Sequence, residues 1–104
     1  MKFGSSFLVV VLGLLAASTG TAQDLSLGED IYKSQCRSCH GPTAKGMASY
    51  PKLVGHPADY LTDKLKRYRA GEKIGPNTML MAPNAQNLSD ADIASIAAFI
   101  TSLE

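Results

Sequence analysis

The segment Cys36-Arg37-Ser38-Cys39-His40 determines how the rest of this chain is interpreted. Two cysteines separated by two residues and followed directly by a histidine form the pattern for covalent attachment of c-type haem. The thiols add across the two vinyl groups of the porphyrin, and their spacing places both sulfur atoms at one edge of the ring. His40 then lies beneath the iron as its proximal ligand. The segment therefore predicts one haem c per chain, attached through Cys36 and Cys39.

Three other kinds of site use similar residues, and the rest of the chain disfavours each of them. A thioredoxin-like dithiol occurs in a βαβ context, whereas this sequence shows helical patterning and no convincing strand. A structural zinc site needs four ligands, but the two histidines, His40 and His56, are far apart in the sequence. A disulfide between Cys36 and Cys39 would close a very small loop and stabilise the chain little.

The first 22 residues have the layout of a secretory signal peptide. Lys2 supplies a basic start, residues 7–17 form an uncharged apolar run, and small and polar residues lead to Ala22. The apolar run is too short to span a bilayer. We therefore expect cleavage after Ala22, a periplasmic location, and no stable membrane insertion after cleavage. The alternative is an uncleaved membrane anchor.

The remaining residues, 23–104, are expected to form one small domain. A chain of this size buries a modest core and usually needs a disulfide, metal or cofactor for stability, so haem should supply part of the core. The net charge of +1 gives no indication of nucleic-acid binding. All Lys and Arg residues of this domain lie between Lys33 and Lys73, whereas its two ends contain only acidic charges.

Capping residues and apolar periodicity indicate three helices. The first is expected to be capped by Ser26, with Glu29 completing a capping box, and to run into the haem motif. The second is expected to begin at Pro57, a residue favoured at the first helical position, and to stop at Gly71.

The third predicted helix has the strongest signature, because Ser89 and Asp92 form a second capping box. Its buried face is expected to consist of apolar residues at helical spacing: Ile93, Ile96, Ala97, Phe99 and Ile100. Two loops rich in Gly and Pro, residues 41–56 and 72–88, connect the helices. The pattern predicts an all-α domain with three main helices and loops around one haem.

The second axial ligand must come from His56 or from Met47, Met79 or Met81. A thioether opposite a histidine raises the reduction potential and suits an electron carrier. Met47 follows His40 closely on the proximal side, and His56 stands at a helix start, where a polar residue commonly caps the helix or contacts solvent. Met79 and Met81 lie in a loop that can reach the opposite haem face. Residues two apart in an extended segment point the same way, so periodicity does not separate these two.

Residues 23–104 as a whole resemble a small class I cytochrome c. The similarity is greatest to short bacterial monohaem carriers and to single domains of dihaem periplasmic cytochromes. It is carried by Cys36-Arg37-Ser38-Cys39-His40-Gly41, Tyr50-Pro51-Lys52-Leu53-Val54-Gly55, Asp59-Tyr60-Leu61 through Leu65 to Gly71, Met79-Leu80-Met81, and Leu88-Ser89-Asp90 with Ile93 to Phe99. The resemblance implies a cytochrome c-like fold.

The resemblance also implies roles for two residues near the iron. The ligating methionine of the family stands seven residues before the leucine that precedes the last helix's cap, a position that Met81 matches. Pro51 matches the family's proline whose carbonyl accepts a hydrogen bond from Nδ1 of the proximal histidine, here His40. Such a bond orients the ligand and raises its basicity.

Two further positions match a helix crossing of the family. Gly28 and Tyr32 correspond to the glycine and aromatic residue through which the first helix packs across the last, here against Ile96 and Phe99. The segment after the proposed methionine ligand, residues 82–84, belongs to a loop that varies in the family.

With His40 and Met81 both bound to iron, no site remains open for oxygen or peroxide. The expected function is therefore that of a soluble periplasmic single-electron carrier, not an enzyme. The alternatives are a haem enzyme or ligand sensor with a weak sixth ligand, and an electron-transfer subunit of a larger oxidase or dehydrogenase complex. The expected partners are a redox protein donor and acceptor that dock transiently at the exposed haem edge, with Lys45 and Lys52 guiding an acidic surface.

Overall fold

The computed structural model describes Gly4 and residues 24–104. The predicted signal peptide and its cleavage site lie outside the described residues, apart from Gly4. The described elements are α1 (Leu25–Ile31), the π-helix η1 (Tyr32–Cys36), α2 (Arg37–His40), α3 (Ala58–Arg69), α4 (Thr78–Ala85) and α5 (Asp90–Ser102). In the described part of the chain, the only extended pairing is an isolated bridge between Met47 and Tyr50. The predicted all-α fold is confirmed.

The first helix is capped by Asp24, whose carboxylate accepts a hydrogen bond of 3.1 Å from the backbone N–H of Leu27. The predicted capping box at Ser26 is wrong, because Glu29 instead forms an ion pair of 2.7 Å with Lys33. Asp and Ser are comparably good N-caps, so the sequence pattern left the start of the helix ambiguous by two residues. As predicted, the helical path then runs through η1 and α2 into the haem motif.

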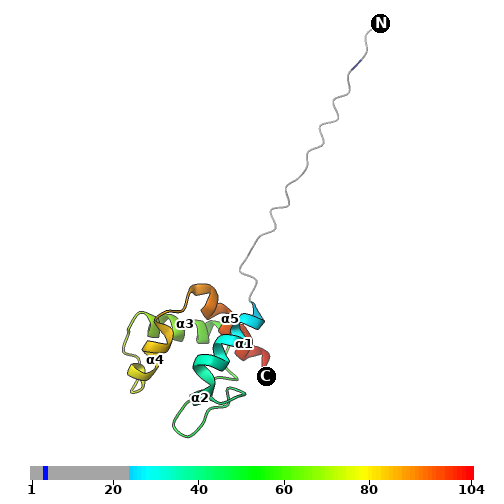
Figure 1. Cartoon of the computed structure of the whole chain (residues 1–104). Helices are drawn as coiled ribbons and strands as arrows, with labels where there is room; N and C mark the ends of the chain where they lie inside the picture. The colour runs from blue at the N-terminus through cyan, green and yellow to red at the C-terminus, as the bar shows by residue number, and fades with distance from the viewer. Residues whose placement is uncertain (1–3, 5–23) are drawn as a thin grey trace.

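Helix α1 crosses α5 at Gly28 (Figure 1). A Cβ atom at this position would lie 2.0 Å from the carbonyl oxygen of Ser95 and 3.0 Å from Cβ of Phe99, so a larger residue would force the helices apart. Tyr32 is 1% exposed, and its ring centroid lies 5.5 Å from that of Phe99. The predicted crossing is present, and Ser95 is the residue that Gly28 meets most closely.

The predicted ends of the other two helices are close to those observed. Pro57 is the N-cap of α3 and not its first helical residue. Gly71 has φ +75°, a left-handed conformation that ends the helical path at little cost for glycine. In α5 the capping box is confirmed: the Ser89 hydroxyl accepts from the Asp92 N–H at 3.0 Å, and the Asp92 carboxylate accepts from the Ser89 N–H at 2.9 Å.

The second predicted loop, residues 72–88, contains the helix α4, which the sequence pattern did not predict. Asn77, its N-cap, makes no side-chain capping bond, and Pro83 lies inside the helix. Both features are more typical of loops than of helices. Tertiary packing supports the helix nevertheless, because Ala85 is fully buried and α4 packs beside α3 (Figure 1).

The core lies between α1, α3 and α5, where α5 contributes the largest buried face. The cluster of buried apolar residues comprises Tyr32, Ala44, Val54, Leu61, Ala85, Leu88, Ile93, Ile96, Ala97 and Ile100. No helix within residues 24–104 combines the length and apolar character needed to cross a bilayer.

Candidate functional site

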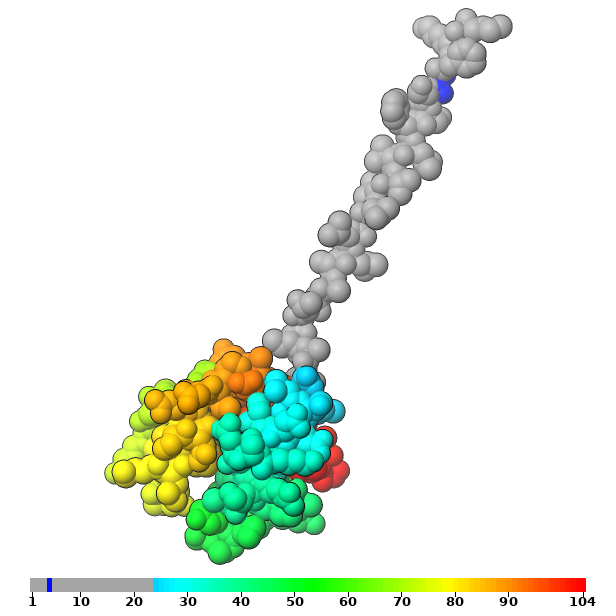
Figure 2. Space-filling view, in the orientation of Figure 1, coloured from blue at the N-terminus to red at the C-terminus, as the bar shows by residue number. Residues whose placement is uncertain are grey.

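A cavity of about 350 Å³ lies between the haem motif and the helices α3, α4 and α5. In Figure 2 the surface is hollowed between α4, coloured yellow, and the green segment that follows the haem motif. Cys36, Cys39 and His40 line one side of the cavity, and Met81 also lines it. No acidic side chain from the described part of the chain contributes to its walls. The site therefore combines two thiols and an imidazole, the groups of the haem c attachment pattern, with a thioether and mainly apolar surroundings.

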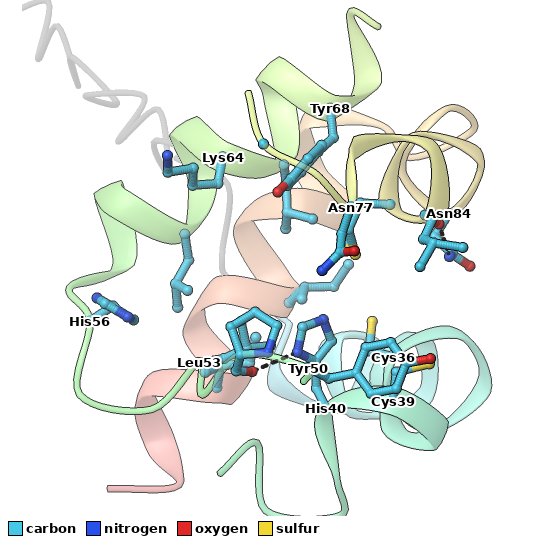
Figure 3. A pocket seen from close by; sticks show the side chains of 18 of the residues that line it. Cys36, Cys39, His40, Tyr50, Leu53, His56, Lys64, Tyr68, Asn77 and Asn84 are labelled. Carbon is cyan, nitrogen blue, oxygen red and sulfur yellow. Dashed lines mark hydrogen bonds between the residues drawn. The ribbon is translucent and has the colours of Figure 1, made fainter. Parts of the chain in front are cut away.

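Both cysteines face the cavity next to His40 (Figure 3). Cys36 is the last residue of η1, and Cys39 lies in α2, which follows directly. The wide turn of η1 is closed by a hydrogen bond from the Arg37 N–H to the carbonyl of Tyr32, five residues earlier. Single π turns within helices are frequent at functional sites. Burial raises the pKa of the Cys36 thiol to about 11 in the polypeptide alone. Because the thiolate is the nucleophilic form of cysteine, this burial leaves the Cys36 thiol a weak nucleophile at neutral pH.

His40 is 5% exposed, and its Nδ1 lies 2.9 Å from the carbonyl oxygen of Pro51 (Figure 3). A carbonyl can only accept a hydrogen bond, so this contact places the proton on Nδ1 and leaves the Nε2 lone pair free for a metal. The contact that the family resemblance implied is thus present in the structure. The backbone around His40 is also held, because Gly46 donates to its carbonyl at 2.9 Å and the Tyr32 hydroxyl donates to the carbonyl of Gly41.

The loop after the haem motif is shaped to present the Pro51 carbonyl. Gly46 has φ +83°, and a Cβ there would lie 2.7 Å from the Tyr50 carbonyl oxygen and 2.9 Å from the Lys52 nitrogen. Only glycine permits this close approach of two backbone segments. Ala44 is fully buried, and its carbonyl accepts a hydrogen bond of 2.8 Å from the Leu53 N–H. The segment from His40 to Leu53 is therefore held largely by its own backbone hydrogen bonds.

The three candidate methionines occupy different environments. Met79 is 87% exposed and Met47 is 50% exposed, whereas Met81 is half-buried and lines the cavity. The predicted extended segment is wrong, because Met79 and Met81 lie in α4. On a helix, residues two apart point about 200° away from each other. The helix thus separates Met81 from Met79, which the pattern of an extended chain could not do.

Of the two roles expected for His56, that of a helix cap is wrong, and the side chain is partly exposed. Pro57 is the N-cap of α3, and the His56 ring instead stacks on Tyr60 with centroids 4.3 Å apart and an interplanar angle of 17°. The ammonium group of Lys64 lies 5.5 Å from the Tyr60 centroid, and all three side chains line the cavity. Figure 3 places His56 and Lys64 on the opposite side of the cavity from the cysteines. Tyr60 and Lys64 are four residues apart on α3, a spacing that makes them neighbours on one helix face.

Thr78, which begins α4, is a further residue near the site that the sequence pattern did not indicate. Its buried hydroxyl accepts hydrogen bonds of 3.1 Å from the N–H groups of both Ile74 and Gly75, and it donates to the Gly75 carbonyl at 2.8 Å. A threonine in a loop rich in Gly and Pro gives no periodic signal, so only the folded structure identifies this contact.

Comparisons with known proteins agree with this geometry. The family model for cytochrome c matches residues 25–104. The chain is 48% identical over 84 residues to cytochrome c-554(548) of Halomonas halodenitrificans, covering 80% of this chain and 100% of that protein. It is 33% identical over 92 residues to cytochrome c4 of Azotobacter vinelandii, covering 78% of this chain and 44% of that protein. It is also 33% identical over 70 residues to the thiosulfate dehydrogenase electron acceptor of Stutzerimonas stutzeri, covering 66% of this chain and 32% of that protein.

Proposed function

Because this chain belongs to the cytochrome c family, we propose that it is a periplasmic single-electron carrier whose haem iron lies between His40 and Met81. Membership of the family implies a covalently bound haem c and a function in electron transport. The proposal adds the residues that hold the haem, Cys36 and Cys39, the two axial ligands and the compartment.

One observation carries the proposal. A single cavity is lined by both thiols of the haem motif, by His40 and by the half-buried Met81. The other methionines near the site do not line it, and Met79 is 87% exposed. This arrangement supports a six-coordinate iron with nitrogen and sulfur ligands, the combination suited to electron transfer.

The chain's own residues account for the tuning of the site. When bound, haem c supplies an iron that cycles between the ferric and ferrous states. The hydrogen bond from His40 to the Pro51 carbonyl fixes the imidazole plane and raises the basicity of Nε2. The thioether of Met81 is a soft ligand that raises the potential. With haem bound, apolar side chains from α3 and α5 would shield the ring from water, which would disfavour the more highly charged oxidation state.

The periplasmic location is supported by the predicted signal peptide of residues 1–22, together with the export that haem c attachment requires in bacteria. A redox enzyme as the electron donor is supported by the name of one relative, a thiosulfate dehydrogenase electron acceptor. We propose that this chain likewise accepts electrons from a protein partner and passes them to another.

Replacing Met81 tests the ligand assignment directly. Ferric haem with a methionine sulfur ligand has a weak charge-transfer band in the near infrared, and Met81→Ala should abolish this band and lower the reduction potential sharply. Met79→Ala is the matched control, because it removes an equivalent side chain from the exposed face of the same helix. Loss of the band in the Met79 variant alone would overturn the assignment. A wild-type protein without the band would favour the alternative of an enzyme or sensor.

A further inference from the structure

The helix that carries Met81 has few apolar anchors of its own. In α4 only Thr78 and Ala85 are buried, while Met79 and Leu80 are 87% and 57% exposed. Pro83 also removes one hydrogen bond from the middle of the helix. A helix of 8 residues is too short to be stable without tertiary contacts. Contacts at its two ends must therefore determine where the Met81 sulfur lies.

The start of α4 is held by the Thr78 hydroxyl and its bonds to Ile74 and Gly75. The other end is held by a residue from a different helix. Arg69, the last residue of α3, donates from one guanidinium nitrogen to the carbonyl of Leu88 at 3.1 Å. Its second nitrogen lies 2.7 Å from a carboxylate oxygen of Asp90.

These two acceptors flank the link between α4 and α5. The Leu88 N–H donates to the carbonyl of Ala85, the last residue of α4, at 3.1 Å, and the Leu88 side chain lines the cavity. The Arg69 side chain is 29% exposed and Asp90 is 74% exposed. An exposed ion pair contributes little, so the bond to the Leu88 carbonyl is the more important half of the contact. The planar guanidinium holds both acceptors in one fixed geometry.

We propose that Arg69 is a positioning residue for the sixth ligand. The fork formed by its guanidinium, which contacts the Leu88 carbonyl and the Asp90 carboxylate, fixes the end of α4 against α3 and thereby keeps the Met81 sulfur at the iron. The inference rests on the proposed function, since it requires Met81 to be the ligand. Without the fork, the link through Leu88 would move more freely, and the thioether would leave the iron more often.

Arg67 provides a matched control on the same helix. Its guanidinium donates to both carboxylate oxygens of Glu72, at 3.0 and 2.8 Å, and lies 3.9 Å from Asp63. The hydrogen bond from Arg67 lowers the pKa of Glu72, as the bond from Arg69 lowers the pKa of Asp90. None of the partners of Arg67 belongs to α4 or to its link with α5.

The test uses the haem-loaded protein and imidazole, a probe that binds ferric iron when the methionine leaves. Loss of the near-infrared band on titration reports imidazole affinity, and far-ultraviolet circular dichroism in denaturant reports global unfolding. Arg69→Met should raise the imidazole affinity about tenfold, the factor that corresponds to about 1.4 kcal/mol and to one lost hydrogen bond from a charged donor. Arg67→Met should remain within about twofold of the wild type, because exposed ion pairs contribute little.

The outcomes separate the two proposals. If the near-infrared band of the wild type is also present in Met81→Ala, the ligand assignment is refuted, regardless of the result for the Arg69 variants. If that band behaves as expected but Arg69→Met lowers the unfolding midpoint without raising imidazole affinity, Arg69 is merely structural and this inference is wrong. Should Arg69→Met fail to fold, Arg69→Lys provides a second variant, which keeps the charge but has a single donating nitrogen in place of the guanidinium. It should raise the affinity about threefold, between no loss and the loss of a full bond, and an affinity equal to that of the wild type would refute the inference.

Discussion

The two sides of the cavity are built in different ways. On the proximal side, His40 and the Pro51 carbonyl that orients it are 11 residues apart, and the loop between them is held by its own backbone bonds. On the other side, Met81 lies on a helix whose end is held by Arg69, 19 residues from its acceptor Leu88. The comparison indicates that the histidine side is preorganised locally, whereas the methionine side depends on how α3, α4 and α5 pack.

The largest expected effect comes from removing the attachment points shared by both sides. Replacing Cys36 and Cys39 together by Ala should give a chain that retains no haem after acid extraction. That chain should also be largely unfolded, because the cofactor supplies much of the core. Far-ultraviolet circular dichroism would measure the loss of helix. A stable, helical, haem-free variant would show that both sides of the cavity are held by the polypeptide alone.

Thr78→Val tests the methionine side at the start of α4. The substitution keeps the shape of the side chain but leaves the N–H groups of Ile74 and Gly75 without their acceptor. We expect about 2 kcal/mol less stability, since partly buried unpaired donors cost about 1–3 kcal/mol each. On heating, the near-infrared band should disappear at a lower temperature than the helical signal. Coincident loss of the two signals would mean that α4 does not loosen independently.

Tyr32→Phe tests the histidine side and is the counterpart of the previous variant. It removes the hydroxyl that donates to the Gly41 carbonyl beside His40. Stability should fall by about 1 kcal/mol, the net value of a typical buried hydrogen bond. The near-infrared band and the helical signal should still disappear together. Early loss of the band in this variant would contradict the distinction between the two sides.

The same tyrosine makes stability depend on alkaline pH. The burial of Tyr32 is the main cause that raises its pKa from 10.0 to about 12. A raised pKa means that the folded state holds the proton more tightly than the unfolded state. The stabilisation is therefore complete below about pH 10 and is lost progressively as the pH rises towards 12. Denaturant unfolding at several pH values should show this loss in the wild type, and Tyr32→Phe should have a flatter profile; equal slopes would contradict the assignment.

The smallest effect is expected at the surface, where the charge pattern predicts docking of an acidic partner. Both Lys45 and Lys52 are exposed, and Lys52 also lines the cavity. Second-order electron-transfer rates with the physiological partner should fall as ionic strength rises, because salt screens steering. The double variant Lys45→Glu and Lys52→Glu should flatten that dependence. Rates that stay flat or rise with salt in the unaltered protein would refute the role of these lysines.

The charge separation along the chain is less complete in the folded protein than the sequence pattern suggests. Arg69, from the basic middle segment, pairs with Asp90 at the start of the acidic last helix, at 2.7 Å. Glu104 at the end of the chain accepts a hydrogen bond of 2.7 Å from the Gly55 N–H, within the basic segment. Contacts that join the ends of the domain to its middle thus bring together some of the charges that the sequence separates.

Features with local causes were predictable from the sequence. The haem motif follows from residue spacing alone, and the capping box of Ser89 and Asp92 involves residues three apart. The contact between His40 and Pro51 followed from the family resemblance, and a short loop with Gly46 at its tight turn brings the two together. Each of these features depends on a few residues that are close in the sequence, so it can be predicted without knowing how distant segments pack.

Tertiary structure decided what depends on distant partners. The sequence around Pro83 indicates a loop, yet burial of Ala85 against the rest of the domain makes α4 helical. That helical geometry separates Met81 from Met79, which an extended chain would leave equivalent. The fork of Arg69 on Leu88 and Asp90 exists only once three helices have met. The sequence by itself thus determined the haem attachment motif and the histidine that we propose as a ligand, whereas the position of Met81 came from packing between distant segments.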